Sequence, residues 1–273
     1  MTGRKLDGAP QGAQAPAWPA PERVQIRWEE RGSGHPLLLI QGLGYARWSW
    51  EPIVGPLAER YRVLYFDNRG IGESDKPAGP YTARQMADDA VQVLDEAGVE
   101  HAHVLGASLG GMIAQELAAF APERVDKLVL CCTHPGLAHG LPMPAVTVAL
   151  FQEAATLSPD VALRRFVVNA LGEDPPAGLV EELYRRRVDN PLDPAGWQAQ
   201  AAAGTTFAGV DAPIAKETLV LTGTADNVVD PGNADVLAER IPGARVERLP
   251  GLGHLFFWED PARTVSIVEE FLG

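Results

Sequence analysis

Residues 106–110 read Gly106-Ala107-Ser108-Leu109-Gly110, between an apolar run at 102–105 and a helix-like stretch at 111–120. This order predicts a strand, a sharp turn and a helix, with Ser108 at the turn. So tight a turn requires strained backbone angles at Ser108, and the two glycines let neighbouring backbone approach without a Cβ collision. The turn exposes Oγ above the sheet and leaves the Leu109 amide at a helix N-terminus, where N–H groups lack partners. We interpret Ser108 as a nucleophile and the Leu109 amide as a donor to an oxyanion.

Apolar runs and helix-like segments alternate along most of the chain, and this rhythm predicts a parallel sheet. Thr82 and Gln85 form a capping-box pattern at the start of one helix, and Asp230 and Asp260 precede prolines that start two others. We expect helices at 48–60 and 83–96, from after Ser108 to about 120, and from 231 and 261. We expect an extended pair around 23–30 and strands at 37–41, 62–66, 103–106, 128–132, 219–221 and 245–249.

The alternation stops between residues 133 and 211, where amphipathic helix-like segments follow one another without a convincing strand. They lie near 145–155, 161–171, 179–187 and 197–207. Ligands of an open parallel sheet bind outside the carboxyl ends of its strands, so an insertion there forms a cap whose apolar side chains line a pocket. We therefore divide the chain into a flexible tail (1–22), a core domain (23–133 and 212–273) and a helical cap (134–211) that follows the sixth expected strand.

The composition limits the possible partners. The 273 residues include 23 basic and 36 acidic side chains, a net charge of −13 that repels nucleic acid and anionic membranes. No apolar run approaches the roughly 18 to 20 residues that span a bilayer, and no apolar leader begins the chain, so we expect a cytoplasmic protein. The only two cysteines, Cys131 and Cys132, are adjacent on an expected strand, which predicts neither a disulfide framework nor a cysteine metal site.

A serine hydroxyl needs a base, most often histidine, and a carboxylate that orients that base. His254 follows the last expected strand, and Asp226 follows the strand at 219–221, so both belong at the same sheet edge as Ser108. Asp230 is the rival acid, but its place before Pro231 is that of a helix cap, and we favour Asp226. The three residues occur in the order Ser, Asp, His.

Two further segments accompany this order. One is Gln41-Gly42-Leu43-Gly44 after one expected strand, and the other is residues 67–74, Asp-Asn-Arg-Gly-Ile-Gly-Glu-Ser, after the next. With the order Ser, Asp, His, they resemble the α/β-hydrolase fold family from about residue 23 onward. The resemblance implies a mostly parallel twisted sheet with helices on both faces. It also implies Ser108 as nucleophile, Asp226 as acid, His254 as base and the Leu43 amide as a second oxyanion donor. Its nearest branch comprises capped carboxylesterases, enol-lactonases and carbon–carbon bond hydrolases, which implies no metal and no organic cofactor.

One position departs from the family pattern. Many relatives carry His-Gly where this chain has Gln41-Gly42. Because Gln41 both donates and accepts hydrogen bonds, it can still brace the loop that carries Leu43.

Other residues have ordinary structural explanations beside functional ones. We expect Asp67 and Arg69 to form a structural ion pair, and the run at 185–187 (Arg-Arg-Arg) to be a solvated helix face unless a carboxylate substrate uses it. Five histidines show no metal-ligand spacing, and of these His134 leaves a strand toward the cap. The residues that we expect in the substrate pocket are Trp48, His134, Met143, Phe151 and Phe207.

Three functions remain open at this stage. The first is a carboxylesterase of short or medium acyl chains, whose partner is a small-molecule ester. The second is a lactonase or carbon–carbon bond hydrolase of ring-cleavage products, whose carboxylate calls for an Arg or Lys in the pocket. The third is a ligand receptor that has lost catalysis, against which the intact Ser108, Asp226 and His254 argue. The sequence leaves the oligomeric state open.

Overall fold

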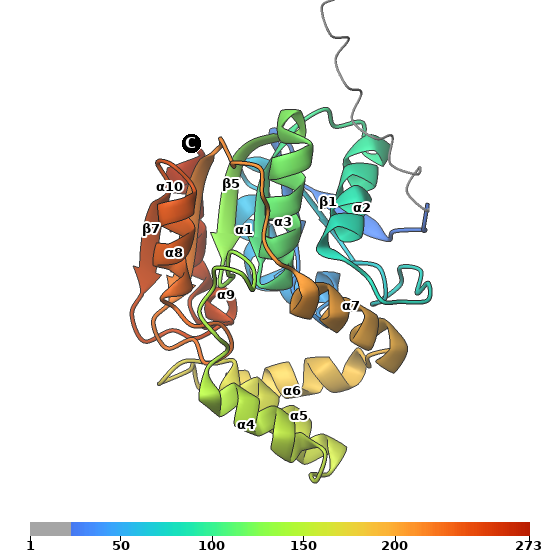
Figure 1. Ribbon diagram of the computed structural model, residues 1–273, viewed down its shortest axis with the longest axis vertical. Helices are drawn as coiled ribbons and strands as arrows, with labels where there is room; N and C mark the ends of the chain where they lie inside the picture. The colour runs from blue at the N-terminus through green and yellow to red at the C-terminus, as the bar shows by residue number, and fades with distance from the viewer. Residues whose placement is uncertain (1–22) are drawn as a thin grey trace, which may run out of the picture.

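Seven strands form one sheet through the centre of the computed structural model, which describes residues 23–273 (Figure 1). The strand order is β1-β3-β2-β4-β5-β6-β7, with β1 antiparallel to β3 and every other neighbouring pair parallel. The mostly parallel sheet predicted from the alternation is therefore confirmed, while the expected tail at 1–22 lies outside the described residues. The strands are β1 (Trp28–Arg31), β2 (His35–Ile40), β3 (Tyr61–Phe66), β4 (Ala102–Ala107), β5 (Val125–Cys131), β6 (Glu217–Gly223) and β7 (Arg245–Leu249).

Helices cover both faces of the sheet, which explains why the central strands are continuous apolar runs rather than alternating ones. Helices α2, α3 and α8 share one buried cluster with one face, and α1, α9 and α10 share a second cluster with the other. Within residues 23–273, no helix combines the length and the apolar character needed to cross a membrane. These helices are α1 (Glu51–Leu57), α2 (Ala83–Glu96), α3 (Leu109–Phe120), α8 (Asn233–Arg240), α9 (Phe256–Glu259) and α10 (Pro261–Leu272), with short 3₁₀ helices at Arg47–Trp50 and Pro122–Arg124.

The capping residues recognised in the sequence lie at or near the starts of the observed helices. Thr82 and Gln85 form the predicted capping box of α2, and Asp260 caps α10 by accepting from the Arg263 amide at 3.0 Å. Helix α8 begins at Asn233, two residues beyond the expected start at Pro231. The carboxylate of Asp230 still serves this turn, because it accepts from the Gly232 amide at 2.9 Å.

Four further helices occupy the segment between β5 and β6. They are α4 (Ala145–Ala154), α5 (Pro159–Asn169), α6 (Leu179–Asp189) and α7 (Pro194–Thr206). The arrowheads of β5 and β7 point toward them in Figure 1, so these helices lie at the carboxyl edge of the sheet. One strand, β1, forms where an extended pair was expected, and the segment therefore follows the fifth strand. The division into core and cap stays a prediction.

The expected ion pair between Asp67 and Arg69 is wrong. Arg69 instead makes a buried two-pronged contact with Asp89 on α2, at 2.6 and 2.7 Å. The carboxylate of Asp67 turns toward Arg47, whose guanidinium lies 2.6 Å away and whose amide lies 2.7 Å away. Sequence proximity favoured neighbours two residues apart, whereas the fold gives each charge a partner from a different segment.

Candidate active site at the carboxyl edge

Ser108 occupies the turn between β4 and α3 with φ 56° and ψ −120°, a conformation that non-glycine residues rarely adopt. Strain of this kind costs on the order of 1–3 kcal/mol and persists only where the surroundings enforce it. Here the Ser108 amide donates to the Cys131 carbonyl at 2.9 Å, and Thr133 Oγ1 donates to the Ser108 carbonyl at 2.7 Å. The strained turn predicted from the sequence is present.

The glycines beside Ser108 are required by close backbone approach. A Cβ on Gly106 would lie 2.2 Å from the Gly110 carbonyl oxygen, and a Cβ on Gly110 would lie 2.0 Å from that of Ile40. Neither contact involves a flexible side chain that can move away. The pentapeptide thus allows α3 to pack directly against β2 and β4.

His254 and Asp226 meet beyond the ends of β7 and β6. His254 Nδ1 lies 2.7 Å from Asp226 Oδ2, and both side chains are buried, with 7% and 4% of each residue exposed. The second carboxylate oxygen accepts from the amides of Val228 at 2.7 Å and Val229 at 3.0 Å. These bonds fix the carboxylate, and the carboxylate fixes the ring with Nε2 as the acceptor when the imidazole is neutral. The rival, Asp230, makes no such contact and serves the turn before α8.

The surroundings of His254 act on its pKa in opposite directions. Burial lowers the pKa because it disfavours the imidazolium, whereas the negative charge of Asp226 raises it, with a smaller contribution from Cys132. The upward effects prevail, and the pKa of His254 lies well above its ordinary value. The carboxylate therefore makes the ring a stronger base.

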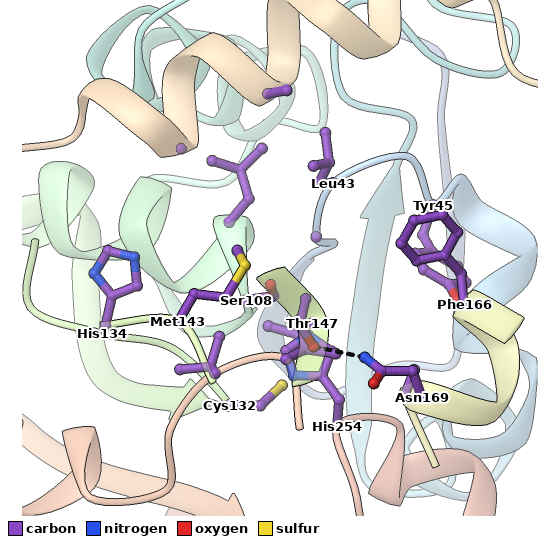
Figure 2. A pocket seen from close by; sticks show the side chains of 18 of the residues that line it. Leu43, Tyr45, Ser108, Cys132, His134, Met143, Thr147, Phe166, Asn169 and His254 are labelled. Carbon is purple, nitrogen blue, oxygen red and sulfur yellow. Dashed lines mark hydrogen bonds between the residues drawn. The ribbon is translucent and has the colours of Figure 1, made fainter. Parts of the chain in front are cut away.

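Ser108 and His254 line one cavity of about 1050 Å³, shown in Figure 2. Within the described residues, no hydrogen bond joins Ser108 Oγ to His254, whose ring is held by Asp226. Catalytic hydrogen bonds are often long in ligand-free enzymes and shorten when substrate binds. The cavity thus brings together the hydroxyl and the imidazole that the sequence placed at one edge.

The loop after β2 lies against Ser108. A Cβ on Gly42 would stand 3.0 Å from Ser108 Cβ and 3.1 Å from the Ala107 carbonyl oxygen, so a larger residue would press on the serine turn. The amides on either side of Leu43 are occupied, because Gly42 N donates to Gln41 Oε1 at 2.7 Å and Gly44 N donates to Gln200 Oε1 at 3.0 Å. In the part of the chain that the structure describes, the Leu43 amide has no acceptor of its own.

Gln41 braces this loop with both polar atoms of its side-chain amide. Its Nε2 donates to Ser49 Oγ at 2.6 Å while its Oε1 holds the Gly42 amide. The amide group thus does the bracing that the sequence analysis assigned to it. The Leu109 amide, at the first position of α3, is the other donor without an intrahelical acceptor.

Three of the five expected pocket residues line the cavity, namely His134, Met143 and Phe151. The other two do not, which corrects the prediction. Trp48 packs against Tyr45 and Trp258, with ring centroids 5.7 and 6.1 Å away. Phe207 is buried in the cluster beneath α2 and α3, and its ring lies 6.4 Å from that of His134.

Several cavity residues escaped the sequence analysis. Cys132 has a positive φ of 40° and stands next to His254, although its pair with Cys131 suggested only a buried strand. Thr147 of α4 and Asn169 of α5 form a 2.7 Å hydrogen bond at the cavity wall (Figure 2). No local sequence motif marks Cys132, Thr147 or Asn169 as cavity residues. The place of Thr147 and Asn169 depends on how the helices between β5 and β6 fold back over the sheet.

Three of the five histidines whose spacing predicted no metal site nevertheless lie together. His35, His101 and His103 gather around Asp126 at the amino edge of the sheet, far from the cavity. Sequence spacing missed this cluster because its members come from the starts of different strands. His139 is exposed, and His134 lines the cavity.

Comparisons with known proteins agree with this geometry. A profile of the alpha/beta hydrolase fold matches residues 35–261. Rhodomycin D methylesterase DauP of Streptomyces sp. (strain C5) is 32% identical over 254 residues, covering 80% of this chain and 84% of that protein. The RutD protein of Azorhizobium caulinodans is 43% identical over 107 residues, so this chain matches only 40% of its length and the similarity covers 39% of this chain. The enol-lactonase of Burkholderia xenovorans LB400 superposes with a TM-score of 0.77 at 26% identity, covering 91% of this chain and 96% of that one.

Proposed function

This chain belongs to the α/β-hydrolase fold family and is a hydrolase, and we propose that it cleaves carboxylic esters of short to medium acyl chain through an acyl-enzyme on Ser108. One observation carries the proposal. The His254–Asp226 pair, held at 2.7 Å, opens on the same cavity as a serine with strained backbone at a strand-to-helix turn. A candidate nucleophile, an oriented base and the residues of both candidate oxyanion amides thus line one cavity.

Each residue of the site has its own role in the proposed reaction. Ser108 Oγ attacks the ester carbonyl carbon while His254 Nε2 takes its proton, and Asp226 stabilises the resulting imidazolium. The amides of Leu109 and Leu43 donate to the oxyanion. His254 returns the proton to the leaving alcohol. Water, deprotonated by the same ring, then releases the acid and restores Ser108.

The cavity supports a small apolar ester as substrate. Its wall is mainly apolar, with Met143, Phe151 and Phe166 facing a few polar groups. A volume of about 1050 Å³ holds an acyl group and an alcohol together. The similarity to a methylesterase favours an ester over an amide or a phosphate substrate.

Hydrolysis of p-nitrophenyl esters from acetate to hexanoate tests this function. We expect Ser108→Ala to lower kcat/KM by at least about 10³-fold, because the oxyanion donors alone retain little catalysis. Ser158→Ala is the matched control, since Ser158 is exposed and its side chain makes no capping hydrogen bond. A Ser108→Ala enzyme that keeps most of its rate would overturn the assignment of the nucleophile. A wild-type chain inert to every ester in the series would overturn the substrate class.

Arg187 favours a lactone or ring-cleavage product as a second candidate substrate. It lines the cavity, where it donates to the Gly44 carbonyl at 2.6 Å and stacks over Tyr45 at 4.6 Å. A guanidinium has five N–H donors, so it can also bind a substrate carboxylate. The similarity to an enol-lactonase fits such a substrate.

Comparing a carboxylate-bearing enol-lactone with a neutral p-nitrophenyl ester separates the two candidates. If the lactone is the substrate, Arg187→Gln raises KM for the lactone far more than for the ester, and Arg187→Lys restores part of the difference. Equal effects on both substrates would reject the second candidate and leave Arg187 as a brace of the loop at Gly44.

A further inference from the structure

A second group of chemically active side chains lies at the opposite edge of the sheet from the cavity. His35 is the first residue of β2, His103 the second of β4 and Asp126 the second of β5. These strands are neighbours in the sheet, and their starts meet at the amino edge because they run parallel. One ligand atom from each residue lies within 4.8 Å of the other two.

A β-bulge between β4 and β5 helps to bring these side chains together. The register pairs Ala102 with Val125 but Val104 with Leu128, so β5 contains one extra residue opposite His103. Bulges redirect side chains that a regular ladder would point elsewhere. The irregularity lies at His103 and Asp126 and is therefore part of the cluster's construction.

His103 is the member that ordinary packing does not explain. Only 8% of the residue is exposed, yet its buried Nδ1 has no hydrogen-bond partner among residues 23–273. A buried polar atom in that state costs about 1–3 kcal/mol. Its ring packs against that of His35 with centroids 4.3 Å apart and the ring planes tilted by 41°.

Burial is the main influence on the pKa of His103. Burial lowers the pKa of His103 to about 4, and the neighbouring His35 lowers it further, while Asp126 acts in the opposite direction. Lys127 and His101 are the other charged groups that act on it. The ammonium of Lys127 is held by the carbonyls of Phe271 and Leu272 at 3.0 and 3.2 Å.

An ion-pair network alone accounts for only part of the cluster. Asp126 Oδ2 accepts from His35 Nε2 at 2.7 Å and from His101 Nδ1 at 2.8 Å, which explains why those two rings are present. It leaves His103 beside them with an unpaired nitrogen. We propose that His35, His103 and Asp126 form a binding site for a divalent transition-metal ion of the Zn²⁺ type, with His101 holding the carboxylate from outside.

The donor set selects this class of ion. Two imidazoles and one carboxylate suit Zn²⁺, Ni²⁺ or Cu²⁺, whereas Mg²⁺ and Ca²⁺ prefer oxygen donors. Zinc bonds of about 2.0–2.1 Å place tetrahedral donor atoms roughly 3.4 Å apart. His35 Nε2 and Asp126 Oδ2, now 2.7 Å apart, must therefore separate slightly, and the ligand atoms lie within 4.8 Å of one another before any movement. The ring of His35 is partly exposed and can make this movement. Three protein ligands leave a fourth position for water.

Calorimetric titration of the full chain, stripped with a chelator and then supplied with ZnCl₂, tests the site. We expect one ion per chain and a rise in Tm with added Zn²⁺. His35→Gln and Asp126→Asn should each weaken binding by at least about tenfold, and His101→Gln by less. His139→Gln is the matched control, because His139 is exposed and lies outside the cluster. Since both main variants change partly exposed side chains, the test does not depend on whether a His103 variant folds.

Two results would overturn the site. One is the absence of binding at millimolar Zn²⁺. The other is binding that persists unchanged in His35→Gln and Asp126→Asn, which would place the ion elsewhere. The rate of ester hydrolysis, measured during the same titration, shows where else the ion binds. If the rate falls in proportion to the Zn²⁺ bound, the ion sits at His254 or His134 in the cavity. A constant rate together with lost binding in the two variants supports the amino-edge site.

Discussion

The two edges of the sheet carry the same pair of side chains at the same distance. His254 and Asp226 lie 2.7 Å apart at the carboxyl edge, and His35 and Asp126 lie 2.7 Å apart at the amino edge. The first pair is buried beside a large cavity, and two backbone amides hold its carboxylate. The second is partly exposed, and its carboxylate is shared with a second ring, that of His101.

The surroundings of each pair give it a different chemistry. In the buried pair one ring faces one carboxylate, the pKa of His254 rises, and the ring becomes a base for Ser108. At the amino edge, the pKa of His103 falls to about 4 through burial, so a neutral imidazole stands beside an anionic carboxylate. A single pair distance therefore assigns no function. The two pairs differ instead in how deeply they are buried, in how many histidine rings share the carboxylate, and in the third side chain beside them, which is Ser108 at one edge and His103 at the other.

Asp226→Asn breaks the buried pair and should have the largest effect. The amide cannot stabilise the imidazolium and favours the wrong tautomer of His254, so we expect kcat to fall by about 10⁴-fold. Steady-state kinetics on a p-nitrophenyl ester measures the loss. Asp235→Asn, at an exposed carboxylate paired with Arg248, is the control and should keep its activity. A fall of less than tenfold would mean that Asp226 does not orient the base.

Gln41→Ala tests the loop that faces the buried pair. Without the bonds to Ser49 Oγ and the Gly42 amide, the Leu43 amide is no longer fixed. We expect kcat to fall about tenfold to a hundredfold with a small change in KM, less than for complete loss of one oxyanion donor. Gln92→Ala, on α2, is the control. An unchanged kcat would show that Leu43 stabilises no oxyanion.

The pH dependence of kcat/KM compares His254 with an ordinary histidine. The reaction needs the neutral ring, so activity rises as the proton leaves, and the raised pKa predicts a midpoint above 6.5. The same shift stabilises the fold below the unfolded-state pKa, and this stability is lost as the pH rises through the folded-state pKa. Rates measured by chromatography of the product give the midpoint. A value below 6.5 would mean that burial outweighs Asp226.

Asp126→Asn should have the smallest effect when no metal is present. Exposed ion pairs contribute at most about 1 kcal/mol, and we expect a change of this size in the free energy of unfolding. The pKa of Asp126 is lowered by the hydrogen bonds of its two histidines against the effect of burial, so its contribution is present above pH 3.8 and is lost as the pH falls further. Urea unfolding at neutral pH and at pH 3 checks both parts. A loss of several kcal/mol would reveal a buried role.

Local patterns predicted the fold and the carboxyl edge because their causes are local. The strained serine turn, the capping box at Thr82 and the cap at Asp260 all depend on residues within a few positions of one another. Asp226 and His254 were found because parallel strands bring their carboxyl ends to one edge, so position after a strand was enough.

The amino edge could not be predicted in this way. Asp126 and His35 are 91 residues apart, and no spacing rule links the starts of three strands through a β-bulge. The same limit explains Trp48 and Phe207, whose apolar character suits a pocket and a core equally. Only the direction in which each side chain packs separates the two, and that direction depends on partners distant in the sequence, such as Trp258 for Trp48.

Labelling with a fluorophosphonate ester, followed by peptide mass spectrometry, tests the role of Ser108 most directly, because the reagent forms a stable covalent bond with an activated nucleophile. Cys132 in the same cavity is the competing nucleophile. We expect a single label on the peptide that contains Ser108, with none in Ser108→Ala and much slower labelling in His254→Ala. A label on Cys132, or labelling that persists in Ser108→Ala, would contradict the assignment of Ser108 as the nucleophile.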